Sequence, residues 1–430
     1  MKHLRWLWIP LVLLVIVLAG GWWLSQRARK TSASPEDPAV AAMLKDPGTI
    51  AKGRYLAVAG DCVSCHTTRG GEPYAGGRML PTPFGNIPAP NLTPDLDTGI
   101  GSWHFLDFWR ALHDGVGHRG EPLYPAFSYT SFTKVTRDDA IALFAYLRSL
   151  PSVRQPNAAL QLRFPYDLRS MLGAWRAVYF KAGVYQADAS QSASWNRGAY
   201  LVQGLGHCNE CHAPRDAWGG LIAGATLSGG QIVGQDWYAP DLSTQANGGL
   251  QGWSRQDLID ALKTGQSSKG VTVGPMADVV ANSTQYLRDD DLQAIADYLL
   301  ALPARAMPAP SHTSFDGKSL ADHGQAVYEE HCANCHGKDG KGVPGIYPPL
   351  DGNASVVEPT GINATRVVLL GGFAPITAGS PRPYSMPPYA QPLSDADVAS
   401  VVTYIRQAWS NHASTVQERE VASYRHTPID

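Results

Sequence analysis

The six cysteines of this 430-residue chain limit its fold most narrowly, because they form three copies of one pentapeptide. The copies read CVSCH at 62–66, CNECH at 208–212 and CANCH at 332–336, and no cysteine is left over. Two thiols one helical turn apart can form thioethers with the two vinyl groups of one porphyrin, and the adjacent imidazole then lies under the ring as an iron ligand. The motif therefore predicts three covalently bound haem c groups.

Other uses of paired cysteines fit this spacing less well. A structural zinc site needs two C-x-x-C pairs about 15–20 residues apart, whereas His66, His212 and His336 are 146 and 124 residues apart. A thioredoxin-like pair would lie near a βαβ pattern, and none surrounds these motifs. Disulfides would not require a histidine after every pair.

Composition excludes nucleic acid as a partner, because the formal net charge is −2 and no Lys/Arg run occurs. Hydrophobic residues make up 44% of the chain, which is enough for a sizeable core, and 43 Gly with 32 Pro predict many loops.

The N-terminus carries a 19-residue stretch without a charge, Trp6–Leu24, which is long enough to span a bilayer core of about 30 Å. A cleaved signal peptide is the alternative, but bulky Trp22, Trp23 and Leu24 occupy the region where small residues belong. We favour a retained anchor in the inner membrane. Since haem c is attached outside the cytoplasmic membrane, everything after the anchor is expected on the periplasmic side.

The chain repeats itself around its three motifs. Related stretches precede them (KGRYLAVAGDCVSCH, RGAYLVQGLGHCNECH and HGQAVYEEHCANCH), and amphipathic stretches follow at 136–150, 287–302 and 393–409. Tyr146, Tyr298 and Tyr404 occupy the same position in those stretches, and two further helices are expected at 103–115 and 253–265. The pattern predicts an all-α fold of three tandem cytochrome c-like helical modules after an N-terminal transmembrane helix.

Changes in composition place the boundaries between these parts. The predicted division is a membrane anchor at 1–30, a linker at 31–45, module one at 46–155, an aromatic inter-domain segment at 156–189, module two at 190–303, a linker at 304–320, module three at 321–412 and a polar tail at 413–430. The aromatic segment either fills a seam between modules one and two or docks on a partner subunit or the membrane surface.

Two methionines are candidates for the second axial ligand of a haem, which in electron carriers raises the reduction potential. Met276 lies 22 residues before Tyr298 and Met386 lies 18 residues before Tyr404, both in Pro/Gly-rich surroundings. Core filling is the usual role of a lone methionine, but two at matching positions favour iron ligation.

Module one has Phe127 at the corresponding position, and phenylalanine cannot bind iron. Either this haem is five-coordinate or another side chain supplies the ligand. The candidates are Met79, Met171, His104, His113 and His118.

Residues 50–410 resemble the tri-haem cytochrome c subunits of membrane-bound bacterial dehydrogenases. The resemblance rests on CVSCHT, LPTPFGNIPAPNLTPDLDTGIGSW, LYPAFSYTSFTKVT, CNECHAPR, GPMADVVANSTQYL, CANCHGKDGKG, YPPLDGN and MPPYAQPLSDADVASVVTYIR. It implies an electron-transfer subunit that accepts electrons from a catalytic partner and passes them through its haems to ubiquinone. By position, it assigns Cys62, Cys65 and His66 to the first haem, Cys208, Cys211, His212 and Met276 to the second, and Cys332, Cys335, His336 and Met386 to the third.

The catalytic partner is inferred from the residues at the sixth-ligand position of the first haem. These typically read P-A-M-P-Y in the alcohol dehydrogenase branch. Here they read PAFSY at 125–129. The Phe form is similar to cytochromes paired with molybdopterin enzymes, so a molybdopterin aldehyde dehydrogenase with an iron–sulfur subunit is favoured. The alternative is a quinoprotein (PQQ) alcohol dehydrogenase or a flavin-linked gluconate or sorbitol dehydrogenase.

No machinery for substrate oxidation is visible in the chain, which has no dinucleotide fingerprint, P-loop or spare cysteine. Two other classes compete with electron transfer for a dehydrogenase. One is a haem enzyme that reduces or binds a small ligand at the first haem. The other is a free-standing quinol oxidase or an oxidase-linked cytochrome relay without a dedicated dehydrogenase.

Overall fold

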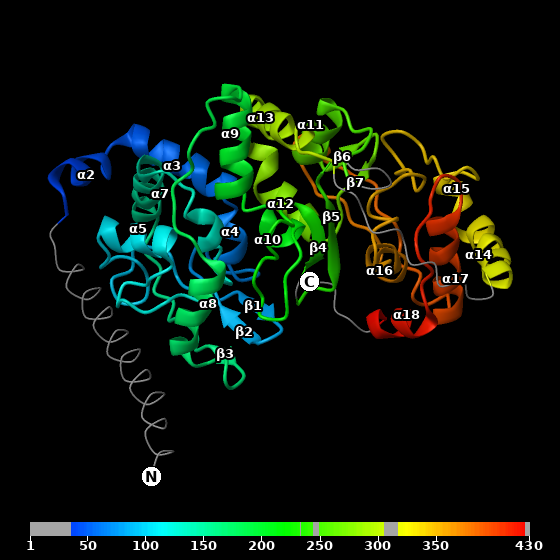
Figure 1. Cartoon of the computed structure of the whole chain (residues 1–430), viewed down its shortest axis with the longest axis horizontal. Helices are drawn as coiled ribbons and strands as arrows, with labels where there is room; N and C mark the ends of the chain where they lie inside the picture. The colour runs from blue at the N-terminus through cyan, green and yellow to red at the C-terminus, as the bar shows by residue number, and fades with distance from the viewer. Residues whose placement is uncertain (1–35, 233, 244–248, 305–316, 426–430) are drawn as a thin grey trace, which may run out of the picture.

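The computed structural model describes residues 36–232, 234–243, 249–304 and 317–425, so the predicted anchor Met1–Lys30 lies outside the described residues. Within these ranges, no helix is both long and apolar enough to cross a bilayer. Figure 1 shows the parts of the chain following one another along the longest axis, from α2 at one end to α14, α15 and α17 at the other.

One helix crossing occurs three times, and a glycine makes each crossing possible. A Cβ atom on Gly53 would lie 1.8 Å from the carbonyl oxygen of Ala142, and the corresponding distances are 1.9 Å from Gly198 to Ala294 and 2.2 Å from Gly324 to Ser400. The backbones therefore touch where the helix before each CxxCH motif crosses the amphipathic helix after it. We keep the name module for the residues around each crossing.

Module one is built from α2 (Pro38–Met43), α3 (Pro47–Ala59), α4 (Cys62–Cys65), β1 (Met79–Thr82), β2 (Gly85–Pro88), α5 (Phe105–Asp114), α6 (Tyr129–Phe132) and α7 (Arg137–Ser149). Helix α7 confirms the amphipathic stretch at 136–150, and the Thr136 hydroxyl caps it by accepting from the Asp139 amide. Helix α5 confirms the stretch at 103–115 and ends at Gly115, whose φ of 59° suits glycine.

Module two contains α9 (Ala193–Tyr200), the π-helical turn η3 (Leu201–Leu205), α10 (Asn209–His212), β4 (Ser228–Ile232), β5 (Trp237–Asp241), α11 (Arg255–Thr264), β6 (Gln266–Ser267), β7 (Gly270–Val271), α12 (Pro275–Asn282), the 3-10 turn η4 (Thr284–Tyr286) and α13 (Asp289–Leu300). Helices α11 and α13 confirm the expected stretches at 253–265 and 287–302. The Ser254 and Asp257 side chains form a reciprocal capping box at the start of α11.

Module three contains α14 (Gly317–His331), α15 (Ala333–His336), α16 (Ile362–Leu370), α17 (Asp395–Gln407) and α18 (Glu418–Tyr424). Helix α17 confirms the stretch at 393–409, again with a Ser394–Asp397 capping box. Residues beyond 412, expected as a polar tail, include α18, where Val421 is fully buried and Arg425 donates to Asp395.

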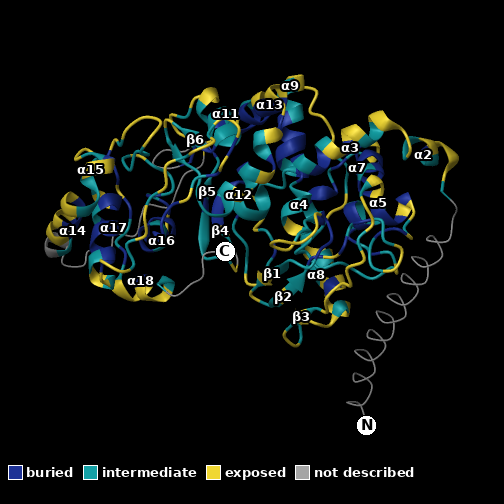
Figure 2. Ribbon diagram, turned by 180° about the vertical axis from the view of Figure 1, so that it is seen from behind, coloured by how far each residue is buried: buried dark blue, intermediate teal, exposed yellow. Residues whose placement is uncertain are grey.

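The cores of modules one and two interlock, whereas that of module three is made of its own residues. Tyr200 and Leu205 of module two belong to the cluster around Leu56 and Phe144. Ala59 of module one belongs to the cluster around Leu292. The third cluster runs from Val327 to Tyr424. In Figure 2 the buried faces of α13 and α17 mark the interiors of modules two and three.

The expectation of an all-α fold holds for the long elements but misses short strands. An antiparallel sheet pairs β1, β2 and β3 (Gln161–Leu162), and β4–β5 and β6–β7 form two-stranded ladders. Their sequences are rich in Pro and Gly, which suits short edge strands and hides them from a search for alternating hydrophobicity.

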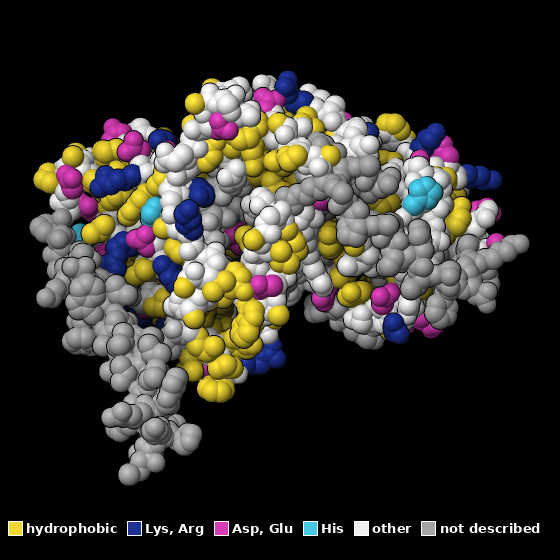
Figure 3. All heavy atoms as spheres, viewed as in Figure 1, with side chains coloured by type: hydrophobic (Ala, Val, Ile, Leu, Met, Phe, Trp, Pro, Cys, Tyr) yellow, Lys and Arg dark blue, Asp and Glu magenta, His cyan; other side chains and the backbone are white. Residues whose placement is uncertain are grey.

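The aromatic segment fills a seam between modules one and two. It contains β3, the 3-10 turn η2 (Arg169–Met171) and α8 (Leu172–Tyr179). Arg176 donates to the Gly115 carbonyl of module one, and Tyr179 donates to Asp216 of module two. The outer face stays apolar, with Phe164 and Val178 more than 70% exposed, and Figure 3 shows hydrophobic side chains gathered over this region.

Candidate haem-binding sites

Each CxxCH motif forms a short helical turn that follows the first long helix of its module. Cys62–Cys65 is α4, and Asn209–His212 and Ala333–His336 are α10 and α15. The backbone amide of each motif histidine bonds the carbonyl of the first motif cysteine, at 3.0, 2.8 and 3.0 Å. None of the six cysteines forms a disulfide. The turn thus places two sulfur atoms and one imidazole on adjacent positions of one helical turn.

The three motif imidazoles are held in the same way by a backbone carbonyl. The Nδ1 atoms of His66, His212 and His336 lie 2.8, 2.7 and 3.0 Å from the carbonyl oxygens of Pro90, Pro240 and Pro348. A carbonyl can only accept, so Nδ1 carries the proton and the lone pair of a neutral ring is on Nε2. Such a second partner orients an imidazole that binds a metal.

Burial favours the neutral form of these groups. It lowers the pKa of His66, His212 and His336, so the rings stay neutral at physiological pH although the carbonyl bonds work in the opposite direction. Burial also raises the pKa of Cys62 and Cys208 to about 12. A thioredoxin-like motif requires the opposite shift, so the arrangement fits haem attachment better than thiol exchange.

The methionine candidates lie on elements with defined backbone geometry. Met276 is in the first turn of α12, directly after Pro275 and after Gly274, whose φ is 57°. The helix that carries it contacts α4 of module one. Met386 forms a backbone bridge with Gly372, with N–O distances of 2.9 and 3.0 Å, and packs against the core of module three.

In module one, Phe127 packs against the core, and its ring centroid lies 5.4 Å from that of Phe132. Each histidine considered as a replacement ligand has a carboxylate near its Nδ1 atom. For His113 and His118 this is Asp114 at 2.8 Å and Asp107 at 3.1 Å, and for His104 it is Glu36 at 3.9 Å. Met79 lies in β1, and Met171 is 41% exposed.

The structure brings the first two motifs close together. The Glu210 carboxylate, inside the second motif, accepts hydrogen bonds from Thr130 and Ser131 of module one at 3.0 and 2.9 Å. His207, one residue before that motif, lies with its ring 5.4 Å from Phe132. Burial raises the pKa of Cys211 to about 11, and the nearby Cys65 adds to this shift.

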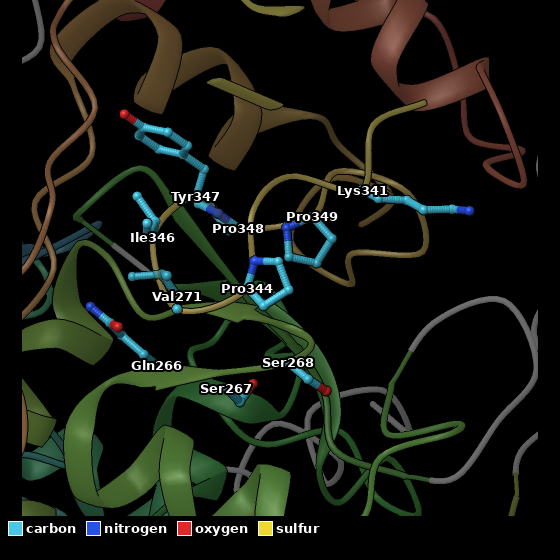
Figure 4. A pocket seen from close by; sticks show the side chains of 11 residues that line it. Gln266, Ser267, Ser268, Val271, Lys341, Pro344, Ile346, Tyr347, Pro348 and Pro349 are labelled. Carbon is cyan, nitrogen blue, oxygen red and sulfur yellow. The ribbon is translucent and has the colours of Figure 1, made fainter. Parts of the chain in front are cut away.

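The third motif meets module two on another side. A pocket between them is lined by Gln266, Ser267, Ser268 and Val271 of the β6–β7 hairpin and by Lys341, Pro344, Gly345, Ile346, Tyr347, Pro348 and Pro349 of module three. Figure 4 shows these two groups facing each other. Pro348 also holds His336, so the pocket belongs to the surroundings of the third motif.

Sequence reasoning missed the three carbonyl partners. A signal was present, because Pro90 and Pro240 directly precede Asn91 and Asp241, which occupy matching positions 12 residues before Trp103 and Trp253. The main chain contributes these acceptors, so the residue type alone did not reveal their role.

Comparison with known proteins agrees with this geometry. The cytochrome c family model matches residues 50–151 and 321–409. The chain is 38% identical over 400 residues to the cytochrome c subunit of alcohol dehydrogenase (quinone) from Gluconobacter oxydans, covering 89% of this chain and 83% of the relative. It is also 38% identical over 395 residues to the gluconate 2-dehydrogenase cytochrome c subunit of Pantoea cypripedii, covering 87% and 89%.

A third relative is a subunit of the nicotinate dehydrogenase of Pseudomonas putida, which is 41% identical over 378 residues. That match covers 85% of this chain but only 31% of the relative, so the chain spans less than a third of that protein.

The fold and the motif turns define a c-type cytochrome. More narrowly, the chain belongs to the family of cytochrome c subunits of bacterial dehydrogenases.

Proposed function

We propose that this chain is a tri-haem electron-transfer subunit that carries electrons from a catalytic dehydrogenase subunit to ubiquinone. The observation that carries the proposal is the triple recurrence of one arrangement: two cysteines outside any disulfide and an imidazole on a helical turn, with Nδ1 held by a proline carbonyl. A single such turn could serve several purposes, but three in one chain suit a relay.

In this proposal the three domains have the boundaries predicted from the sequence. Cys62 and Cys65, Cys208 and Cys211, and Cys332 and Cys335 attach the haems, and His66, His212 and His336 bind their irons from one side. Met276 and Met386 close the second and third haems from the other side. Haem supplies reversible one-electron chemistry, and the chain supplies attachment, axial ligands and orientation.

The direct test of the site assignment is the haem content of the purified full-length protein. Three covalent haems per chain support the assignment. A value of two or fewer overturns it, and a peptide map of the haem-bearing fragments then identifies the motif that is empty.

The catalytic partner we favour is a molybdopterin aldehyde dehydrogenase with an iron–sulfur subunit, because Phe127 replaces the methionine typical of the alcohol dehydrogenase branch. A quinoprotein or flavin-linked partner is the second candidate, supported by the similarity to alcohol and gluconate dehydrogenase cytochrome subunits. Purification of the native complex in mild detergent, followed by cofactor analysis, separates them. Molybdenum with additional non-haem iron supports the first, and PQQ or flavin with haem iron alone supports the second.

For location, we propose a single N-terminal anchor in the inner membrane with the haem modules on the periplasmic side. The support is the uncharged stretch Trp6–Leu24 with basic residues at both ends. Replacing Met1–Lys30 by a cleavable signal should release a soluble tri-haem protein. Tight membrane attachment of the shortened protein would contradict a single anchor and would direct attention to the apolar face around Phe164 and Val178.

A further inference from the structure

Modules one and two are joined by two equivalent tyrosine–aspartate hydrogen bonds that cross the boundary in opposite directions. Tyr55 of α3 donates to Oδ2 of Asp291 on α13, and Tyr200 of α9 donates to Oδ2 of Asp139 on α7, both at 2.5 Å. The two donors are 236 and 61 residues from their acceptors. Each module thus contributes one tyrosine and one aspartate to the other.

The reciprocity follows from the repeat itself. Tyr55 and Tyr200 stand two residues after the crossing glycines Gly53 and Gly198, and each acceptor stands seven residues before the shared tyrosine of its helix. Such equivalent positions relate the two modules by a local two-fold axis.

A basic residue of the same module holds each aspartate in place. Lys52 Nζ lies 2.6 Å from Asp139 Oδ1, and Arg197 Nε lies 2.6 Å from Asp291 Oδ1. The side chains of the two aspartates are only 10% and 2% exposed. Arg288 lies a further 3.2 Å from Asp291 Oδ2. Two buried carboxylates, each with at least one cation and a phenol, therefore form fixed contacts rather than mobile surface pairs.

These bonds belong to the helices that lead directly into the first two motifs. Cys62 lies seven positions after Tyr55, and Cys208 lies eight positions after Tyr200. Because each helix is fixed to the opposite module, its motif turn cannot shift independently of the other. The contacts of Glu210 with Thr130 and Ser131 secure the same junction at the second motif itself.

Module three provides a contrast within the chain. It keeps the internal pair, with His323 Nε2 2.8 Å from Asp397 Oδ1, but two residues after Gly324 it has Ala326 instead of tyrosine. Its contacts with module two are of another kind and include two hydrogen bonds between the Asn363 side chain and the Tyr238 backbone at 2.9 and 2.7 Å.

We infer that Tyr55 and Tyr200, with Asp291 and Asp139, are positioning residues that fix the first and second haem-binding turns relative to each other and so set the rate of electron exchange between those two haems. The inference rests on the proposed function for the presence of the haems. The exchange moves one electron: one haem is oxidised as the other is reduced, and no proton or co-reactant is needed.

The test uses the full-length haem-loaded protein and the double variant Tyr55→Phe/Tyr200→Phe, which keeps both rings and removes only the two hydroxyl groups. The control is Tyr185→Phe in the segment at 156–189, which keeps the ring beside Tyr200 and removes only a hydroxyl that donates to Asn196 at 2.8 Å. After one haem is reduced by a short pulse, the rate of redistribution between the first and second haems is followed by absorbance.

We expect the double variant to slow this exchange severalfold. Its haem content, ligand spectra and folded fraction at the assay temperature should remain those of the wild type. The control variant should leave the exchange rate unchanged. A native rate in the double variant would overturn the inference even if its melting temperature fell, since the residues would then only stabilise the fold. If the double variant does not fold, Tyr55→Phe and Tyr200→Phe are measured singly. By the local symmetry each should slow the exchange by a similar factor, and two native rates would refute the role.

The haem content separates the two proposals. Missing haem at the first or second motif of the wild-type protein overturns the proposed function, whereas a full complement with an unaltered exchange rate overturns only the positioning role.

Discussion

The Nδ1 atom of His212 lies 2.7 Å from the carbonyl oxygen of Pro240. This bond directs the Nε2 lone pair away from the β5 backbone and keeps the ring from turning. The geometry recurs at His66 and His336, so each motif histidine is oriented by its own module, and the loss of one is expected to affect one haem.

Replacing His212 by alanine should therefore reduce the haem content from three to two per chain, because the second haem loses its proximal ligand. The measurement is haem per protein together with a map of haem-bearing fragments. His412→Ala is the matched control, since His412 is exposed, lies outside the motifs and is not a candidate ligand. Loss of all three haems in the first variant would show that the sites are not independent.

Met276→Leu should leave the second haem attached but lower its reduction potential, on the order of 0.1 V out of a range of about 0.8 V accessible through axial ligands. It should also open that iron to carbon monoxide. A redox titration and a carbon monoxide difference spectrum measure both effects. Met43→Leu serves as control, because Met43 packs against the core of module one and is not a candidate ligand. An unchanged potential would show that Met276 is not the ligand.

Gly198→Ala should destabilise the protein by at least about 1–3 kcal/mol, the usual cost of overpacking, because the new Cβ would lie 1.9 Å from a backbone carbonyl oxygen that cannot rotate away. Gly183→Ala is the control, since no atom lies within 4 Å of a Cβ at that position. Denaturant unfolding followed by circular dichroism gives both free energies. Equal values for the two variants would refute the close crossing.

Acid should weaken the junction between modules one and two. Burial alone would raise the pKa of Asp291, but hydrogen bonds from Arg197 and Tyr55 outweigh it and leave the pKa below its ordinary value of 3.8. The carboxylate therefore contributes stability above about pH 4, and this contribution is lost as the pH falls through the lowered pKa.

The check is the difference in unfolding free energy between the wild type and Asp291→Asn, measured from pH 7 to pH 3. It should be largest near neutrality and shrink below about pH 4. Asp97→Asn, at a carboxylate 67% exposed, should show no comparable change. A difference for Asp291→Asn that stays constant over this range would contradict the role of the ionised carboxylate.

The sequence predicted the long helices well because local signals define them. Helix α17 lies within the expected 393–409 and starts at Asp395, directly after the N-cap Ser394, and the capping residues can be recognised in the sequence. The sequence also predicted the equivalent positions of the three shared tyrosines, because the same pattern occurs in three copies. Their alignment corresponds to real contacts, as Tyr146, Tyr298 and Tyr404 all lie beside a crossing glycine.

What the sequence did not predict depends on long-range geometry. The Tyr55–Asp291 bond joins residues 236 positions apart, and no periodicity indicates such a pair. The proline carbonyls are main-chain groups, and the strands are too short and too rich in Pro and Gly to show alternation. The apolar face of the segment at 156–189 is visible in the sequence, but its contacts with Gly115 and Asp216 needed the fold.

The π-helical turn η3 explains how module two can differ from module one in the number of residues between the tyrosine and the CxxCH motif. Module two has seven residues between Tyr200 and Cys208, whereas module one has six between Tyr55 and Cys62. In a regular α-helix one added residue would turn everything beyond it by about 100° and carry the cysteine off the face on which it must lie. A widened turn at Leu201–Leu205 absorbs the surplus residue. Tyr200 and the second motif can therefore both keep their orientation about the helix axis. Module two thus accommodates an added residue that a regular α-helix would not.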